Sequence, residues 1–459
     1  MSDRAVLKFG GTSAADPERI AEIFTADPET NRVAVISAIG KDVGDTNGGP
    51  KLTDQLLALE EAVDHGDKDA AKETRDFVIN RTLKKYACLG SAVLAETRDY
   101  MEDLLQPSRL GDRYVWVGEH TSAKLFAKVT GATYLSSSLR FSGGTLHLGD
   151  SLKRIVRDVM PVVHSGRQVV TEGFFGFDNL SGRVDVLPRG GSDITGVVYT
   201  GALDASQPEH WINLNYTDKD GLFSADPDIV KNARVIPEIT HEEVREKMHG
   251  VTERNGPIHG DAIAYASRLD VEMFVRNSFN PKAPGTHIVA NRSSNPRLPI
   301  IGVSGKDSIV ALDAFDMGMA DATNYLSGII AKIGSLGVSI SNIPTSEDRI
   351  KPIFNNGATD EQLAAITAHI LEGAISGDKA VVEVTEDEGA VYLVGQELTD
   401  PLTYTRTLGR VATLLAEAGL PMREVISLEK SPSLAITVAG EHVKPIIQLL
   451  HRAFLENAA

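Results

Sequence analysis

Two short glycine turns carry the residues of this chain that are best suited to handling an anionic group. Residues 6–13 read VLKFGGTS, where an apolar run delivers Lys8 to a Gly-Gly turn. Residues 186–196 read VLPRGGSDITG, where Arg189 and Asp193 flank a second Gly-Gly turn. Such a turn between a strand and a helix leaves backbone N–H groups free to converge on phosphate oxygens, and a lysine beside it adds positive charge. An arginine can bind a carboxylate through two parallel hydrogen bonds.

Each motif also has an ordinary structural interpretation. KFGGTS matches neither the Walker A nor the GxGxxG pattern, so by itself it fits a tight turn. Asp193 by itself fits a helix N-cap, and Glu119 in WVGEHTSAKLFAKV fits a glutamate favoured by the helix dipole. The acidic loop 215–236 lacks the closing glutamate of an EF-hand, so DKDG and ADPD are predicted to be turns. His249 and His259 are expected to be exposed loop residues, and no protein-held metal is predicted.

The elements that must position these residues are apolar runs alternating with helical stretches. RVAVISAI, RQVVTEGFFG and LDVEMFVRNS are apolar on both faces, as buried parallel strands are. The stretch from about Asp54 to Leu105 has a helical period. This alternation predicts an α/β sandwich with the sheet in the middle. NRSSNPRLP at 291–299 reads as a linker, and the shorter units beyond it predict two βαββαβ ferredoxin-like units.

Composition narrows the class of protein. The chain has 459 residues and a formal net charge of −17, which argues against non-specific binding to nucleic acid or to an anionic membrane surface. Cys88 is its single cysteine, so an intramolecular disulfide is impossible and a reducing compartment is expected. No apolar run approaches the roughly 18 residues of a membrane span. A cytoplasmic location is therefore expected.

In their order and spacing, the motifs resemble those of the aspartate kinases. KFGGTS, VGEHTS, RGGSD, YTDKDGLFSADP and VRNSFNPKAPGTHI follow one another along the first part of the chain, and GVSISNIPTSE and VAGEHVKPIIQLLHRAF resemble that family's ACT domains. The resemblance implies an amino-acid-kinase-type three-layer α/β sandwich with a mainly parallel central sheet over residues 1–292. It implies a paired ACT regulatory region over 299–459, with one ACT unit, about 316–386, inserted in the other.

The implied reaction is transfer of the γ-phosphoryl group of ATP to the side-chain carboxylate of L-aspartate, giving 4-phospho-L-aspartate, toward lysine, threonine and methionine. Lys8 would stabilise the transferring phosphoryl group, and Asp193 would orient the cationic groups around it. Glu119 would meet the substrate ammonium and Arg189 its carboxylate. The other implied contacts fall into two groups. Ser37, Thr53 and Ser192 would contact substrate, and Gly10, Gly11, Ser13, Thr217, Asp218, Phe223 and Asp226 would join Lys8 around the nucleotide. Mg²⁺ would arrive with ATP, and no residue is assigned as a metal ligand.

Departures from the family pattern lie on the nucleotide side. Asp228 stands where the family has an arginine, and Gly256 stands where it has a phosphate-facing lysine. Arg254 or Lys219 could replace the missing positive charge. Ser341 replaces an effector-binding acid, so inhibition by lysine does not follow from the resemblance.

Two alternatives therefore stay open. One is a kinase for another small amino acid or carboxylate, and the other is a degenerate kinase that senses an amino acid. An amino-acid effector at the ACT region and a homodimer or higher homo-oligomer are implied as well.

Overall fold

The computed structural model describes residues 3–41, 51–106, 114–206, 208–250, 256–293, 299–317, 319, 324–354, 358–427 and 430–456. The chain forms two compact units that interleave along the sequence. The first contains Met1–Leu222, Val235–His241 and Pro257–Arg292, and the second contains Phe223–Arg234, Glu242–Gly256 and Ser293–Ala459. The predicted boundary at 292–299 coincides with the last change between the units, and it remains a prediction about domains.

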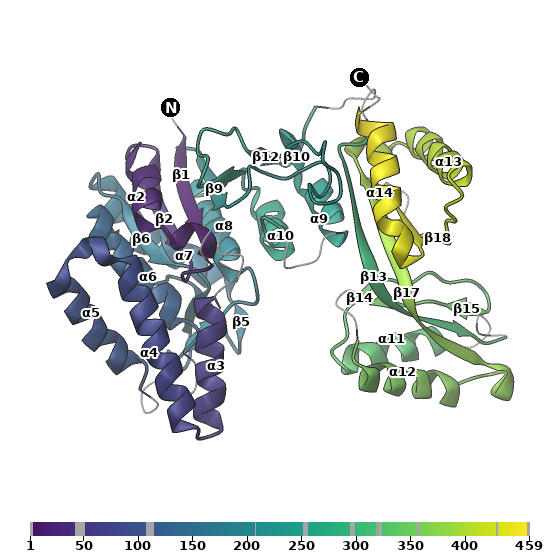
Figure 1. The fold of residues 1–459 in the computed structure, drawn as a ribbon, viewed down its shortest axis with the longest axis horizontal. Helices are drawn as coiled ribbons and strands as arrows, with labels where there is room; N and C mark the ends of the chain where they lie inside the picture. Colours follow the sequence, from purple (N-terminus) through teal and green to yellow (C-terminus); the bar gives the residue numbers. More distant parts are fainter. Residues whose placement is uncertain are drawn as a thin grey trace. The chain divides into compact units, whose positions relative to one another are not determined.

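The first unit is built on an eight-stranded sheet with the order β10-β12-β11-β9-β1-β2-β6-β3 (Figure 1). Every neighbouring pair is parallel except β11 with β12. The strands are β1 (Arg4–Phe9), β2 (Asn31–Ile36), β3 (Thr133–Tyr134), β6 (Val169–Glu172), β9 (Trp211–Thr217), β10 (Glu238–Thr240), β11 (Met273–Asn277) and β12 (Thr286–Val289). A second sheet has the order β5-β4-β7-β8, from β4 (Arg140–Ser142), β5 (Thr145–Leu146), β7 (Phe175–Asp178) and β8 (Val184–Val186).

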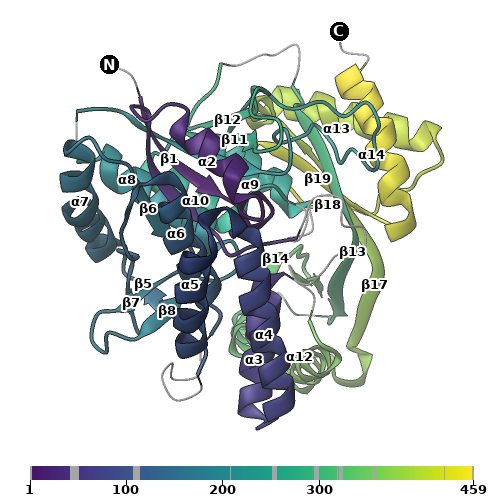
Figure 2. The same ribbon diagram turned by 60° about the vertical axis from the view of Figure 1, so that its left-hand side comes forward.

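Helices cover both faces of the large sheet. They are α1 (Gly11–Ala14), α2 (Pro17–Thr25), α3 (Leu52–Asp64), α4 (Lys68–Lys85), α5 (Ser91–Leu104), α6 (Val117–Thr130), α7 (Leu148–His164), α8 (Gly191–Asp204) and α10 (Gly260–Leu269), with a 3-10 turn at Ala87–Leu89. The stretch predicted to be helical from 54 to 105 thus contains three α-helices, and α3 and α4 lie side by side (Figure 2).

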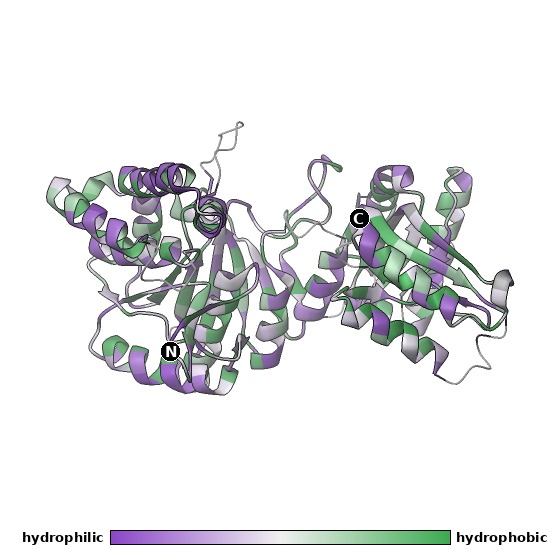
Figure 3. Ribbon diagram, turned by 90° about the horizontal axis from the view of Figure 1, so that it is seen from below, coloured by the Kyte–Doolittle hydropathy of each residue, from purple (hydrophilic) through white to green (hydrophobic). Residues whose placement is uncertain are grey.

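Alternation along β1 explains the layers. Phe9 enters the core that α2 and α6 cover, where its ring lies 6.2 Å from that of Phe126. Lys8 points to the other face, because a Cβ on Gly196 of α8 would lie 3.1 Å from the Cβ of Lys8. The strands are rich in hydrophobic residues, whereas the covering helices mix both kinds (Figure 3). Burial of the sheet on both faces follows from these near-continuous apolar strands.

The second unit has a sheet with the order β14-β16-β13-β17-β19-β18, and β15 pairs with β13. Its strands are β13 (Gly302–Phe315), β14 (Ile340–Asn342), β15 (Arg349–Ile350), β16 (Ile353–Phe354), β17 (Val381–Val394), β18 (Glu424–Val425) and β19 (Ser433–Val438). Its helices are α11 (Tyr325–Ser335), α12 (Asp360–Glu372), α13 (Pro401–Glu417) and α14 (Val443–His451), and α9 (His241–His249) belongs to it from residue 242 on.

Two long strands join the halves of the second unit. Residues 302–306 of β13 pair with 390–394 of β17, and 309–315 pair with 381–388 beyond a shift in register. The shift separates two cores, one beneath α11 and α12 and the other beneath α13 and α14. One ferredoxin-like half is therefore inserted within the other. None of the helices in the described part of the chain is both long enough and apolar enough to cross a membrane.

An ionic cluster is buried in this unit. The Lys351 ammonium lies 2.8 Å from Oε1 of Glu388 and 3.1 Å from Oε1 of Glu424. Glu388 is on the shared strand β17 and is fully buried, whereas Glu424 begins β18. These two hydrogen bonds raise the pKa of Lys351 although its burial opposes this. The cluster thus ties the inserted half to the other half.

Candidate active site

The first Gly-Gly turn lies where β1 ends near the middle of the large sheet. Gly10 donates its N–H to the Tyr216 carbonyl of the neighbouring β9, at 3.1 Å, and Gly11 opens the short helix α1. Gly40 packs directly on this turn, since a Cβ at Gly40 would lie 2.5 Å from the carbonyl carbon of Gly11. Its N–H also donates to the Gly11 carbonyl at 2.8 Å. The turn therefore requires glycine at position 40, whereas a Cβ at Gly11 would make a tight contact, 3.1 Å from the Ala38 carbonyl oxygen.

The second Gly-Gly turn precedes α8 on the opposite face of the sheet. Gly190 has a φ of 76°, a left-handed conformation that favours glycine, and a Cβ there would collide with His259. Gly190 is the N-cap of α8, and it provides no side chain to cap the helix. Asp193 is the third residue of that helix and not its cap, so its carboxylate is available for other partners. The cap interpretation of Asp193 is wrong.

The two turns bring Lys8 and Asp193 together. The Lys8 ammonium lies 2.5 Å from Oδ1 of Asp193, and both side chains are about one-tenth exposed or less. Asn215 of β9 donates to the same Oδ1 at 3.0 Å, and the backbone N–H of His259 donates to Oδ2 at 3.2 Å. A Cβ on Gly10 would lie 3.2 Å from Lys8 Nζ. The Lys8 amine therefore lies at the glycine turn and is held by the Asp193 carboxylate. The Asn215 amide and the His259 N–H orient that carboxylate.

Glu119 supplies a second acidic group, on the other side of the sheet. It lies in the first turn of α6 and is only 4 % exposed. Burial raises the pKa of its carboxyl to about 8, although the backbone N–H groups of Glu119 and Ala38 oppose this shift. Its Oε2 is buried, and no described residue hydrogen-bonds to it. A buried carboxylate with one oxygen unpartnered among the described residues is suited to receiving an ammonium group.

Ala38 connects the Glu119 helix to the first turn. A Cβ on Gly118 would lie 2.9 Å from the Ala38 Cβ, and a Cβ on Gly11 would lie 3.1 Å from the Ala38 carbonyl oxygen. Ala38 thus packs between the start of the Glu119 helix and the first Gly-Gly turn. The neighbouring side chain on α6 fixes the helix, because Nδ1 of His120 lies 2.8 Å from Oε1 of the fully buried Glu172.

The remaining predicted substrate residues gather at the same end of the sheet. Ser37 follows β2 directly and donates its N–H to the Phe9 carbonyl at 3.2 Å. Ser192 in the first turn of α8 packs on Gly173, where a Cβ would lie 2.6 Å from Ser192 Oγ. Thr53 is half-buried in the first turn of α3. Arg189 is exposed on the second turn. Carboxyl ends of parallel strands are the usual place for ligands in such folds.

The predicted nucleotide residues are divided. Ser13 bonds through its hydroxyl to that of Ser278, at 2.8 Å, and Ser278 donates its N–H to the Thr217 carbonyl at 2.9 Å. Thr217 is buried and Asp218 is exposed. Phe223 and Asp226 belong to the second unit, where Oδ1 of Asp226 accepts an N–H two residues on at 2.9 Å within the predicted turn. Their role at a nucleotide remains a prediction.

The two positions at which the family has a cation belong to the second unit, where Gly256 is half-buried and Asp228 is exposed. Of the two proposed replacements, Lys219 is exposed in the first unit. Arg254 lies outside the described residues. Their contribution to the site stays a prediction.

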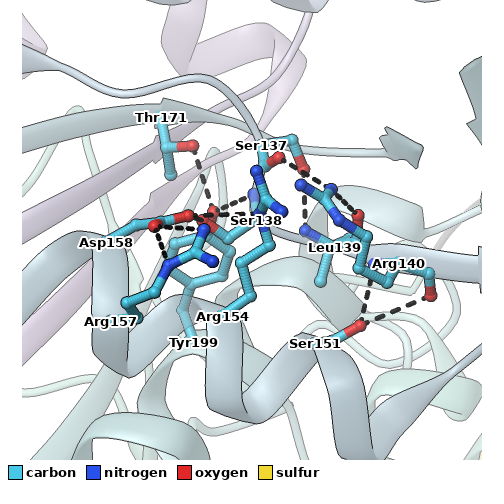
Figure 4. Close-up of polar contacts among 10 residues, drawn as sticks. All are labelled: Ser137, Ser138, Leu139, Arg140, Ser151, Arg154, Arg157, Asp158, Thr171 and Tyr199. Atoms are coloured by element: carbon cyan, nitrogen blue, oxygen red, sulfur yellow. Dashed lines mark hydrogen bonds and ion pairs between the residues drawn. The ribbon is translucent and has the colours of Figure 1, made fainter. Parts of the chain in front are cut away.

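A polar network holds the rest of α8 in place (Figure 4). The Tyr199 hydroxyl accepts the N–H of Ser138 at 2.9 Å and lies 3.3 Å from the hydroxyl of Thr171 on β6. Ser138 donates its hydroxyl to Asp158 of α7 at 3.0 Å, and Asp158 also pairs with Arg157 at 2.8 Å. Burial raises the pKa of Tyr199, which keeps it a neutral donor and acceptor. The helix that carries Asp193 is thereby joined to β6 through Thr171 and to α7 through Ser138 and Asp158.

Three residues of this region were missed or misread in the sequence. Asn215 looks like one polar letter in the strand WINLNYT, and only the register with β1 shows that it lies beside Lys8. His259 was expected to be an exposed loop residue, but it is partly buried and is the N-cap of α10. Phe174, just before β7, has a φ of 76°, which is strained for an aromatic residue. The glycine before it, Gly173, was the one sign in the sequence that an unusual backbone turn could occur here.

A cavity of about 980 Å³ also lies in the first unit, between the start of α2 and the end of α4. Arg19, Arg81 and Lys84 are among its lining residues, and no predicted site residue is. In the described part of the chain, no three His, Cys, Asp or Glu side chains gather as a metal site would need. The chemistry indicated by the two turns therefore centres on Lys8 and Asp193.

Comparison with known proteins agrees with this arrangement. The family model described as the amino acid kinase family matches residues 3–277. Aspartokinase 3 of Bacillus subtilis is 25 % identical over 98 % of this chain and 98 % of its own length. Lysine-sensitive aspartokinase 3 of Escherichia coli is 26 % identical over 99 % of this chain and 100 % of its own length.

Solved structures share the fold. The aspartate kinase of Clostridium acetobutylicum has a TM-score of 0.79 at 22 % identity, covering 98 % of this chain and 100 % of its own. Aspartokinase III of E. coli in complex with aspartate and ADP has a TM-score of 0.76 at 24 % identity, covering 99 % and 100 %. The predicted fold class, an α/β sandwich followed by ACT-like units, is confirmed. The resemblance to the aspartate kinases is confirmed as well, and the chain belongs to the amino acid kinase family.

Proposed function

We propose that this protein is an aspartate kinase, which transfers the γ-phosphoryl group of ATP to the side-chain carboxylate of L-aspartate. The observation that carries the proposal is the Lys8–Asp193 pair between the two glycine turns, together with the packing of the Glu119 helix on the first of these turns through Ala38. A phosphate site and an ammonium site side by side suit a substrate that is both an amino acid and a phosphoryl acceptor. Near full-length similarity to named aspartokinases supports the choice of amino acid.

The geometry suits the chemistry of phosphoryl transfer, which depends mainly on positioning and on neutralising charge. The Lys8 ammonium would stabilise the oxygens of the transferring group, and the N–H of Gly11 at the start of α1 would point to the same oxygens. The N–H of Gly10 is already donated to the Tyr216 carbonyl, so its expected phosphate contact does not fit this structure. Glu119 would hold the substrate ammonium, and Arg189 its α-carboxylate. Ser37, Thr53 and Ser192 would complete the substrate contacts. This fixes the acceptor carboxylate while leaving its oxygen free to attack.

ATP is proposed as the phosphoryl donor, and a related structure holds ADP. Mg²⁺ bound to the nucleotide would neutralise the phosphate charge. Asp193 would orient the cationic groups around the phosphates, because its carboxylate already orients the Lys8 ammonium.

The second unit is proposed to be a regulatory ACT pair, with residues 1–292 as the catalytic domain and 299–459 as the regulatory region. The insertion of one half within the other supports this assignment. An amino-acid effector is proposed to bind here, and a homodimer is the proposed assembly. The mass of the protein in solution tests the assembly, and a monomeric mass would contradict it.

A direct assay tests the function. Purified protein with Mg-ATP and L-aspartate is trapped with hydroxylamine, and the aspartyl hydroxamate is measured. We expect Lys8→Ala to lower kcat by about a hundredfold to a thousandfold, the usual cost of removing one group that stabilises transition-state charge. Lys128→Ala is the matched control, because its ammonium is 43 % exposed on α6.

Three results would contradict the proposal or its mechanism. Hydroxamate with another amino acid but none with aspartate would indicate a kinase for a different substrate. Nucleotide binding without any hydroxamate would indicate an amino-acid sensor. Full activity of Lys8→Ala would overturn the mechanism itself.

A further inference from the structure

Asn215 is a buried polar side chain in the middle of an apolar sheet. It lies on β9, which is flanked by the parallel strands β1 and β11, and its exposed fraction is 0 %. In the strand register it lies opposite Lys8 on β1 and opposite Val275 on β11. Burial of an amide in such a place costs free energy unless its hydrogen-bonding groups find partners.

The amide has one partner, and that partner is the acid of the candidate site. Nδ2 of Asn215 donates to Oδ1 of Asp193 at 3.0 Å, whereas its own Oδ1 is buried and has no partner among the described residues. The acceptor of Asn213, two residues earlier on the strand, is likewise buried and without a partner among the described residues. What distinguishes Asn215 is therefore the partner of its donor, the Asp193 carboxylate.

The same oxygen of Asp193 also accepts the Lys8 ammonium at 2.5 Å. Lys8 is on the next strand, so Nζ of Lys8 and Nδ2 of Asn215 reach one carboxylate oxygen from adjacent strands of one sheet face. His259 donates its backbone N–H to the other oxygen at 3.2 Å from the start of α10. The carboxylate is thus fixed in orientation by donors from three elements.

A second asparagine shows what a purely structural contact looks like. Asn213 lies two residues earlier on the same face of β9 and is 1 % exposed. Its Nδ2 donates to the hydroxyl of Thr200 at 3.2 Å, in the middle of α8. Both asparagines join β9 to α8, and only Asn215 reaches the ionic pair.

We propose that Asn215 is a positioning residue, which holds the Asp193 carboxylate in place so that the Lys8 ammonium is aimed at the transferring phosphoryl group. When an anionic phosphate draws Lys8 forward, the amide of Asn215 stays bonded to Asp193 and keeps the carboxylate from following the ammonium. This inference rests on the proposed phosphoryl-transfer function, and it adds a residue that none of the motifs shared with the aspartate kinases contains.

The test compares Asn215→Leu with Asn213→Leu, which remove amides of equal size from one strand face. We expect Asn215→Leu to lower kcat by about a hundredfold with the KM values for aspartate and ATP nearly unchanged, the cost of misplacing a reacting group. Asn213→Leu should keep the kcat of the wild type, measured per folded protein. Unchanged kcat in Asn215→Leu, or an equal loss in both variants, would overturn the proposal.

A pH profile adds a readout that a structural role would not move. Asn215→Asp would place a second carboxylate against Asp193, with the Lys8 ammonium of β1 and the His259 N–H of α10 facing the pair. Two carboxylates in contact share one proton as the pH falls. We expect the kcat of this variant, relative to the wild type, to rise on going from alkaline to acidic pH. A profile parallel to that of the wild type would contradict the proposal, and this variant decides the matter if Asn215→Leu does not fold.

Failure of the proposed function can be told apart from failure of this inference. Absence of hydroxamate from the wild type would refute the function alone. A crystal structure of Asn215→Leu needs no turnover, and we expect the distance between Lys8 Nζ and Asp193 to exceed the roughly 4 Å of an ion pair, or the carboxylate to rotate. An unchanged pair and an unchanged carboxylate would overturn the inference.

Discussion

The buried carboxyl of Glu119 makes the stability of this protein depend on pH in a way that one substitution should remove. Burial raises its pKa from 4.5 to about 8. At about 1.36 kcal/mol per pKa unit, the ionised form is disfavoured in the folded protein by about 5 kcal/mol. The side chain is only 4 % exposed, so solvent screens little of this cost.

The sign follows from which state holds the proton. The unfolded chain releases the Glu119 proton near pH 4.5, whereas the folded protein keeps it until about pH 8. The folded state is therefore favoured at low pH, and the free energy of unfolding falls as the pH rises through this interval. Glu119→Gln keeps a neutral group of the same size. We expect its stability relative to the wild type to rise from about zero near pH 4.5 to several kcal/mol above pH 8.

Urea unfolding at a series of pH values measures the difference. Subtracting wild type from variant removes every other titrating group, because those groups are common to both proteins. Glu96→Gln on α5 is a control, since that carboxylate is 76 % exposed and should give a difference near zero throughout. A Glu119→Gln difference that is the same at pH 5 and pH 9 would refute the reasoning.

The pH dependence of aspartate binding should also report the ionisation of Glu119. If the aspartate ammonium binds the ionised carboxylate, its affinity should increase by about tenfold per pH unit up to about pH 8 and then level off. Aspartate should also raise the stability of the wild type by mass action, and should do so much less in Glu119→Gln. Calorimetric titration at several pH values checks this. A pH-independent affinity would mean that the ammonium binds elsewhere.

Two further substitutions test the packing described above. Gly40→Ala should lower stability by about 1 to 3 kcal/mol and reduce activity, because its Cβ would lie 2.5 Å from Gly11, whereas Gly149→Ala has no heavy atom within 4 Å and should be tolerated; urea unfolding compares them. Lys351→Met should destabilise the second unit by about 3 to 5 kcal/mol, because it leaves Glu388 buried without its cation; an unchanged midpoint in thermal unfolding would show that the cluster contributes nothing.

The sequence predicted the parts of the site that sit on turns. Gly-Gly pairs after apolar runs mark strand ends, and the resemblance to the aspartate kinases implied that Lys8 and Asp193 share one site. The shared edge of a parallel sheet does not explain their meeting, because the second pair follows β8 of the smaller sheet. The roles of polar residues in the middle of a strand could not be predicted in this way. Asn215 and Asn213 are two polar letters in WINLNYT, and their partners depend on strand register and on which face α8 covers. Those are tertiary facts that local periodicity does not contain.

His259 was misjudged for a related reason. Its neighbours in the sequence are polar, which suggested an exposed loop. A Cβ at Gly190 would collide with His259. The second Gly-Gly turn and the start of α10 are therefore in contact, although about seventy residues separate them in the sequence. The composition of the second unit was equally hidden, because residues 223–234 directly follow the first unit's Leu222 and yet join a core formed by residues 300–454.

That interleaving bears on how the polypeptide is made and how it can be shortened. Ala225 and Val230 belong to the core beneath α13 and α14, so they emerge from the ribosome long before the residues that will cover them. The large sheet, in turn, gains β10, β11 and β12 only after those segments have been translated. A chain truncated after residue 292 would contain the whole large sheet and still expose two segments of the second unit without the core that they join. Removing the rest of the second unit by a single cut should therefore yield an aggregation-prone protein.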